Sequence, residues 1–108
     1  MYSIEYLESA KKDIDDAIFY IRYYLCNRTA AINLHNAIQK EIQNISLFPY
    51  GNSAFIPNIK LDEEYRSSRV KNYSIFYTID ENAKTVIIVR IQYNKRLFEK
   101  LLTFKSES

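Results

Sequence analysis

Apolar residues recur at helical spacing through the first half of the chain. After Ser9, a first stripe with intervals of three and four consists of Ala10, Ile14, Ala17, Ile18, Ile21 and Leu25. A second stripe follows Thr29, ends before Pro49, and consists of Ala31, Leu34, Ile38, Ile42 and Ile45. The pattern predicts two helices with Ser9 and Thr29 as N-caps. Because the join is short, we expect the helices to fold back as an antiparallel hairpin.

The hydrophobic period changes to two after residue 64. Alternation predicts one strand around residues 65–72 and a second through Ile75, Tyr77 and Ile79. A third strand, TVIIVRIQY, follows the polar turn DENAK. Its segment 86–89 is apolar on both faces, which is typical of a central strand. A short SIEY alternation at residues 3–6 predicts one more strand before the helices.

The remaining segments complete one α+β domain over residues 1–108. Residues 49–64 hold both prolines and the single glycine, which indicates a connecting loop. Residues 94–104 suit a short terminal helix. The expected order is strand, helix, helix, strand, strand, strand and this helix, with the helical hairpin packed on a small, mainly antiparallel sheet.

Composition excludes several kinds of site. The chain has 108 residues, one cysteine and one glycine, so an internal disulfide, a thiolate metal cluster and a glycine-rich phosphate loop are all excluded. Cys26 is expected to pack on the apolar helix, and His35 alone supports no metal site. No cofactor is expected. The absence of a long apolar run and of a signal-peptide layout predicts a cytoplasmic protein with no membrane contact.

Charge divides unevenly along the chain. Residues 1–64 carry six Lys and Arg against nine Asp and Glu, whereas residues 65–108 carry nine against four. This asymmetry can create a positive field that attracts phosphates or an acidic partner. The alternative is a set of scattered surface charges on an ordinary domain.

Most of the excess positive charge falls on and after the predicted strands. The cluster consists of Arg66, Arg69, Lys71, Arg90, Lys95 and Arg96. Arg90 interrupts an apolar strand, so its guanidinium is expected to reach a carboxylate or the surface. Converging arginines suit phosphodiester binding, or stabilisation of the charge that grows when a 2′-OH attacks a phosphate. Tyr73 and Tyr93 can contact a partner or stack on bases, and their alternative role is ordinary packing.

Four motifs in order resemble the RelE/ParE superfamily of toxins over nearly the whole chain. They are A-x-x-D-I-x-x-x-x-x-Y-I, L-F-P-x-G, Y-R-x-x-x-V-x-N-Y-x-I-F-Y and V-x-I-x-R-I, within IEYLESAKKDIDDAIFYI, SLFPYG, YRSSRVKNYSIFYTID and VIIVRIQYNKR. The resemblance implies the toxin of a type II system encoded with a small antitoxin, which would be its protein partner. It also implies the compact fold already expected from the pattern.

The resemblance leaves two kinds of target. RelE-like members are ribosome-dependent mRNA endonucleases; Arg66 and Arg96 match their basic positions, so catalytic roles would fall to Arg66, Arg69, Lys71, Tyr93 and Arg96. Ser74 stands where such enzymes often carry an arginine, and Leu102 or its neighbours replace their late tyrosine. The long hairpin and L-F-P-x-G are more similar to the ParE branch, whose members inhibit DNA gyrase. A ParE-like toxin is therefore the first interpretation, and a degenerate toxin that only binds antitoxin is a further alternative.

Two expectations concern the basic residues in space. Arg66, Arg69, Arg90 and Arg96 are predicted to form one basic groove. That groove, with Lys71, Tyr73 and Lys95, is expected to bind the target or an acidic, amphipathic segment of the antitoxin.

Overall fold

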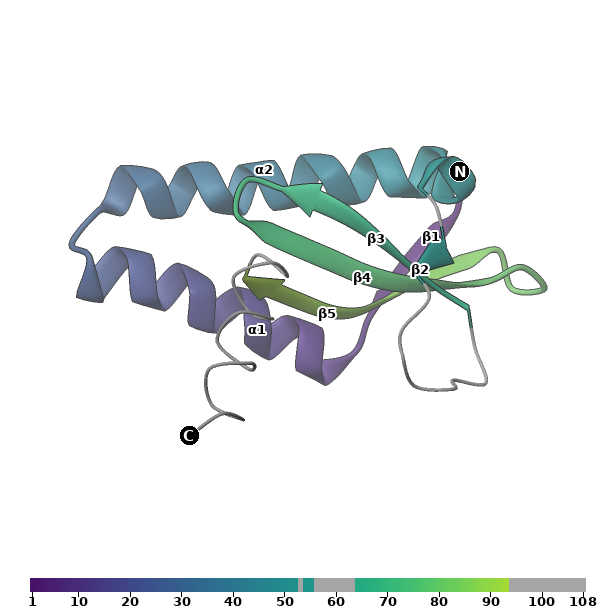
Figure 1. The fold of residues 1–108 in the computed structure, drawn as a ribbon, viewed down its shortest axis with the longest axis horizontal. Coiled ribbons are helices and arrows are strands. Elements are labelled where there is room, and N and C mark those ends of the chain that lie inside the picture. Colours follow the sequence, from purple (N-terminus) through teal and green to yellow (C-terminus); the bar gives the residue numbers. More distant parts are fainter. Residues whose placement is uncertain (53, 56–63, 94–108) are drawn as a thin grey trace, which may run out of the picture.

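The computed structural model describes residues 1–52, 54–55 and 64–93. Its elements are β1 (Ser3–Tyr6), α1 (Glu8–Phe19), the π-helix η1 (Tyr20–Tyr24), α2 (Arg28–Leu47), the 3₁₀-helix η2 (Pro49–Gly51), β2 (Ala54–Phe55), β3 (Tyr65–Val70), β4 (Tyr73–Asp80) and β5 (Thr85–Tyr93). The long strands lie across the hairpin of α1 and α2 (Figure 1).

The sheet has five strands in the order β1-β5-β4-β3-β2. β1 pairs with β5 in parallel, and the other neighbours are antiparallel. β5 is therefore an interior strand, as its apolar run predicted. The α+β architecture with a mainly antiparallel sheet is confirmed.

The core lies between the hairpin and one face of the sheet. Its largest fully buried side chains are Ile38 and Ile45 from α2 together with Ile75, Tyr77, Val86 and Ile88 from the sheet. Burial of each aliphatic side chain contributes about 1.5–3 kcal/mol. The helical stripe of α2 and the alternation of β4 and β5 thus meet in a single layer.

Both helix starts differ from the predicted caps. Leu7 precedes α1 and makes no side-chain cap, while the Ser9 hydroxyl donates to the Val89 carbonyl at 2.8 Å. Asn27 caps α2, because its side-chain oxygen accepts from the Ala30 amide at 2.9 Å. Thr29 lies inside the helix. Tertiary contact with β5 outweighs local capping at Ser9, and asparagine is as good a cap as threonine.

The turn of the hairpin also departs from prediction. α1 widens into η1, where the Leu25 amide bonds to the Tyr20 carbonyl at 3.1 Å, and Leu25 is exposed instead of packed. Cys26 adopts a left-handed φ of 50° and is exposed, so the expectation of a packed thiol is wrong. The wider π-turn rotates these residues away from the stripe on which a regular helix would place them.

The predicted connecting loop contains two short elements. η2 and β2 lie within residues 49–64, and Ala54 pairs with Arg66 of β3. The terminal helix predicted for residues 94–104 lies outside the described residues. Among the helices described, none has the combination of length and apolarity that crossing a bilayer requires.

Candidate functional site

The predicted basic residues divide between the two faces of the sheet. On β3, Ser68 and Val70 are buried against the helices, and Arg66 shares their face because side chains alternate along a strand. Arg69 points to the opposite face, which we call the outer face. Register places Arg69 beside Ser74 in β4 and Arg90 beside Phe76. The four-arginine groove is therefore wrong as predicted, because Arg66 lies across the sheet from Arg69.

Arg66 is held by three neighbours. Its guanidinium lies 2.6 Å from the Glu64 carboxylate and donates to the Asn52 carbonyl. It also sits 5.0 Å from the centroid of the Tyr50 ring. Only 16% of the Arg66 side chain is exposed. These contacts fasten the segment around η2 to β3 and leave little of the guanidinium open to a phosphate.

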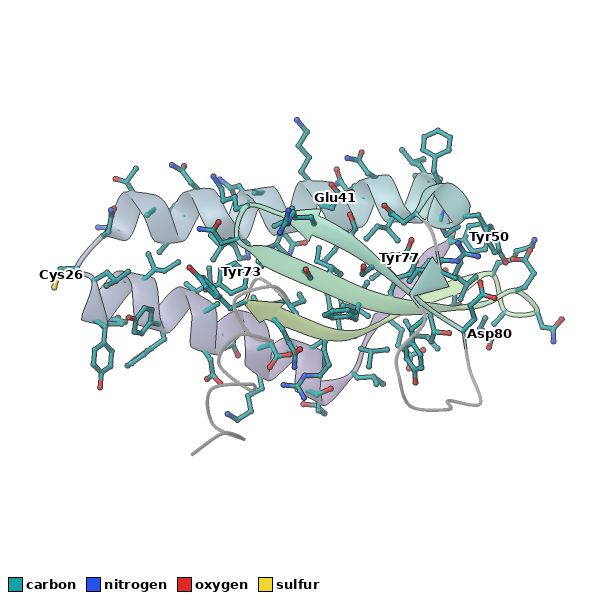
Figure 2. All side chains as sticks on the ribbon, viewed as in Figure 1. Cys26, Glu41, Tyr50, Tyr73, Tyr77 and Asp80 are labelled. Atoms are coloured by element: carbon teal, nitrogen blue, oxygen red, sulfur yellow. The ribbon has the colours of Figure 1, made fainter. Side chains whose placement is uncertain are left out.

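Tyr77 completes this inner cluster. Its hydroxyl donates to the Pro49 carbonyl at 2.7 Å and accepts from the Asn52 side chain at 3.2 Å. Burial raises the pKa of the Tyr77 hydroxyl, so it remains a neutral donor. Figure 2 shows Tyr50 and Tyr77 at the same end of the molecule, with Tyr73 towards the other end. The L-F-P-x-G segment and the strand motifs are thus bonded to one another through Arg66 and Tyr77.

Arg90 bonds to a carboxylate, which is one of the two outcomes expected for a charged residue in an apolar strand. Its Nε and Nη2 donate to Asp13 of α1 at 2.8 and 3.1 Å. Hydrogen bonding to Asp13 raises the pKa of Arg90. The same carboxylate accepts from the Ile91 amide at 3.0 Å. Since β1 pairs with β5 only as far as Ile88, Asp13 takes over the hydrogen bonding of the edge where β1 ends.

Tyr73 and Tyr93 face each other across β4 and β5 on the inner side. Their ring centroids are 5.3 Å apart in an edge-to-face arrangement. Burial, followed by the neighbouring Tyr93 and Tyr20, raises the pKa of Tyr73. The two rings line a groove of about 690 Å³ against α1 and η1, whose lining also includes Asp13 and Asp16. Tyr93 is thus on the opposite face from Arg69.

Arg69 and Lys71 are the basic residues of the predicted set that stay exposed and unengaged. Both are exposed, and neither forms an ion pair within the described residues. Lys71 occupies the turn between β3 and β4 with a φ of 51°. Lys95 and Arg96 lie outside the described residues. The structure therefore brings together Arg69 and Lys71 at one end of β3, with Arg90 across the outer face.

Sequence patterns did not reveal the partners that hold these cations. In the sequence, Asp13 is an ordinary acidic residue of the first predicted helix, and Glu64 and Tyr50 lie in the connecting loop predicted for residues 49–64. Glu81 was also missed: its carboxylate accepts from the hydroxyls of Tyr2 and Tyr50, at 2.8 and 2.6 Å, and from Lys84. These bonds, led by Lys84, lower the pKa of Glu81 from 4.5 to about 2. No motif signals such long-range pairs.

The described part of the chain contains no set of side chains arranged to bind a metal ion. Over residues 1–52, 54–55 and 64–93, no group of three or more His, Cys, Asp or Glu side chains is placed to hold an ion. His35 lies on α2 and is exposed. What the outer face offers is cationic side chains on a rigid sheet, which suits binding of an anionic or acidic surface.

Solved structures share the fold at low sequence identity. The P. aeruginosa chromosomal ParDE TA system superposes with a TM-score of 0.67 at 16% identity, covering 88% of this chain and 98% of that one. The Mycobacterium tuberculosis toxin–antitoxin complex RelBE2 gives 0.60 at 17% identity, covering 86% and 98%. A metal-bound toxin from Helicobacter pylori gives 0.60 at 15% identity, covering 90% and 99%.

Sequence comparison supplies the family. No curated protein matches the chain. A family model described as the ParE toxin of the type II toxin-antitoxin system, parDE, matches residues 4–98. The match spans β1 to β5, which include every motif on which the resemblance was based. The chain belongs to the ParE toxin family of type II toxin–antitoxin systems, within the RelE/ParE superfamily.

Proposed function

We propose that this toxin arrests growth by binding a large cellular target without cutting RNA, that DNA gyrase is this target, and that a cognate antitoxin neutralises it. The family match supports the toxin role. One observation carries the choice of mechanism: the residues that a nuclease would need together lie on two faces of the sheet. Arg69 is on the outer face, and Tyr93 is on the inner face.

Acid–base catalysis requires a proton-transfer group within hydrogen-bond reach of the reacting phosphate. Tyr93 packs edge-to-face on Tyr73, and β4 and β5 separate it from the surface that Arg69 presents. Arg66 and Arg90 are already bonded to Glu64 and Asp13. A phosphate would have to compete with those carboxylates for either guanidinium. This arrangement favours a binding role over catalysis.

Arg69 and Lys71 have the properties expected of contact residues. Both are exposed and unpaired within the described residues, and a strand and a tight turn hold their backbones in place. Arginine on a rigid element is common among the residues that dominate binding energy. We therefore assign Arg69 and Lys71 to the surface that meets the target.

The test measures both candidate activities with one protein preparation. Purified toxin is added to a DNA gyrase supercoiling assay and, separately, to a translation reaction whose transcripts are mapped for cleavage. We expect supercoiling to be inhibited and transcripts to stay intact. The Arg69→Glu/Lys71→Glu variant should weaken the inhibition about tenfold or more, because it reverses two contact charges. A variant reversed at Lys11 and Lys12 on α1 serves as the control of equal net charge.

Two outcomes would contradict the proposal. RNA cut within translated codons, with supercoiling intact, would identify a ribosome-dependent mRNA endonuclease. Normal growth after induction of soluble, folded protein in cells without antitoxin would indicate a degenerate toxin that only binds antitoxin.

A further inference from the structure

The distal half of the helical hairpin carries no negative side chain. Between Asp16 and Glu41 there is no aspartate or glutamate, whereas the segment contains Arg22, Arg28, Lys40 and the only histidine. The net negative charge of residues 1–64 therefore comes from residues 1–16 and 41–64. The hairpin turn is a separate positive region, far along the helices from the acidic start of α1 (Figure 1).

Large apolar side chains cluster at the same turn. We use the name aromatic tip for Phe19, Tyr20, Tyr23, Tyr24 and Leu25, each of which is at least half exposed, up to 75% for Tyr24. The π-turn pairs their rings: Phe19 lies 4.7 Å from Tyr23, and Tyr20 lies 5.6 Å from Tyr24. Rings fixed against one another lose little further entropy when a partner covers them. Contiguous exposed patches of this kind mark interaction sites.

A hollow of about 220 Å³ adjoins the aromatic tip between the two helices. It is lined by Ile18 and Arg22 from the first helical arm and by Arg28, Ala31, Ile32 and His35 from α2. The apolar residues form its floor, and Ile32 is half exposed. The Arg22 guanidinium lies 5.2 Å from the centroid of the Tyr23 ring, so it joins the hollow to the aromatic tip.

The cations of this hollow are not neutralised. In the described part of the chain, Arg22 and Arg28 form no ion pair, whereas Lys11 and Lys12 of α1 pair with Glu8 and Asp16. Two arginines around an apolar floor, beside exposed tyrosines, match the composition of protein interface hot spots. A phosphate group would use the arginines but would gain nothing from the isoleucine floor or the rings.

We propose that the aromatic tip and its hollow dock an amphipathic, carboxylate-rich segment of another protein. Its apolar residues would cover Ile32 and the rings, and its carboxylates would pair with Arg22 and Arg28. This site is centred on the hairpin, whereas Arg69 and Lys71 lie on β3 and on the turn that follows it. Tyr20 and Leu25 of the aromatic tip also line the groove next to that turn, together with Asn72 and Tyr73. The site does not depend on which machine the toxin inhibits.

The experiment measures binding of defined probes to the full chain by fluorescence anisotropy. The main probe is a labelled helical peptide with leucine at i, i+3, i+4 and i+7 and glutamate at the flanking positions. A second peptide replaces glutamate by glutamine, and a third is oligoglutamate. Single-stranded oligothymidylate tests the nucleic-acid class. We expect the leucine–glutamate peptide to bind most tightly and to weaken as salt shortens the screening length.

Variants locate the site. Arg22→Glu/Arg28→Glu should weaken peptide binding about tenfold or more, since two exposed pairings become repulsions. Glutamate at position 28 suits the N-terminus of α2, so folding should be preserved, and circular dichroism checks this. Lys11→Glu/Lys12→Glu makes the same change in net charge on paired lysines of α1 and should leave the affinity within about twofold. Ile32→Ser should weaken binding about threefold to tenfold through lost apolar contact.

Three results would overturn the proposal. One is equal affinity of the wild type and the folded Arg22/Arg28 variant for the peptide. Another is an equal loss in the Lys11/Lys12 control. The third is tighter binding of oligothymidylate than of the leucine–glutamate peptide. None of them bears on gyrase inhibition, so failure here and failure of the proposed function are distinguishable.

Discussion

Arg66 and Arg69 stand three positions apart on β3, yet they belong to different parts of the molecule. Arg66 lies on the inner face, where Glu64, Asn52 and Tyr50 engage it. Arg69 lies on the outer face and is exposed, with no ion pair among the described residues. A residue that matches a family motif can therefore stabilise the fold instead of binding a partner. Free cations, rather than motif cations, are the ones available to a partner.

The largest effect should come from the buried centre of the inner face. Tyr77→Ala removes a fully buried ring and its bonds to Pro49 and Asn52. We expect the free energy of unfolding to fall by about 3–5 kcal/mol, as for other large-to-small core changes. Urea denaturation measures it. Ser74→Ala, on the outer face of the same strand, should change stability by less than about 0.5 kcal/mol. Equal losses of unfolding free energy in the two variants would show that the inner and outer faces do not differ in their contribution to stability.

Asp13 should come next, because one carboxylate serves both Arg90 and the Ile91 amide. Asp13→Ala leaves both donors without their acceptor in a site where only 15% of that side chain is exposed. A loss of about 2–3 kcal/mol in unfolding free energy is expected. A double-mutant cycle with Arg90→Met separates the guanidinium from the amide. If Asp13→Ala does not change the free energy of unfolding in the Arg90→Met background, the hydrogen bond from the Ile91 amide to Asp13 makes no measurable contribution to stability.

Replacing the two arginines tests the comparison directly. Arg66→Ala should cost about 1–2 kcal/mol, through lost hydrogen bonds and lost packing on Tyr50. Arg69→Ala should change stability by less than about 0.5 kcal/mol. Thermal or urea unfolding of both variants under the same conditions gives the two values. A larger loss for Arg69 would mean that the outer face carries the structural role.

The smallest effect concerns pH and the carboxylate of Glu81. Its pKa in the folded chain is about 2, below its ordinary 4.5, so the ionised form is favoured by folding. The resulting stabilisation is fully present above about pH 4.5 and is lost as pH falls towards 2. Glu81→Gln should remove that part of the acid sensitivity. Unfolding curves between those pH values, for wild type and variant, measure the difference, and parallel profiles would contradict the prediction.

Much of the fold could be read from the chain because period and burial are linked locally. The stripe ending at Ile45 and the alternation through Tyr77 each require only neighbouring residues to predict an element. The interior position of β5 followed from apolar residues on both its faces. The turn of the hairpin could not be predicted, because the change to a π-turn at Tyr20 leaves no mark in the spacing of the stripe.

The candidate site was less accessible to sequence reasoning. Side chains alternate along a strand, so Arg66 and Arg69 fall on opposite faces of β3, and the expectation that they would converge in one groove did not take this alternation into account. Arg66 contacts Tyr50 and Arg90 bonds to Asp13, and both partners are distant in the sequence, by 77 residues in the case of Asp13. Single-chain patterns carry no information on such pairs. The positive region at the hairpin turn is visible in the sequence, because no carboxylate lies between Asp16 and Glu41. The net charge of residues 1–64 as a whole is negative and does not reveal it.

The pairing of β1 with β5 has a consequence for the order of folding. Ile4 and Val86 are register partners, and Ser9 contacts Val89 across 80 residues. While the chain is being synthesised, the residues of the two helices are translated well before the strand that covers their apolar faces. A ribosome-bound chain that stops before residue 85 therefore exposes an uncovered hairpin, which is prone to capture by chaperones. Such late closure of nonlocal contacts makes folding slow relative to helix formation, so the sheet can form its contacts with the hairpin only after β5 has been translated.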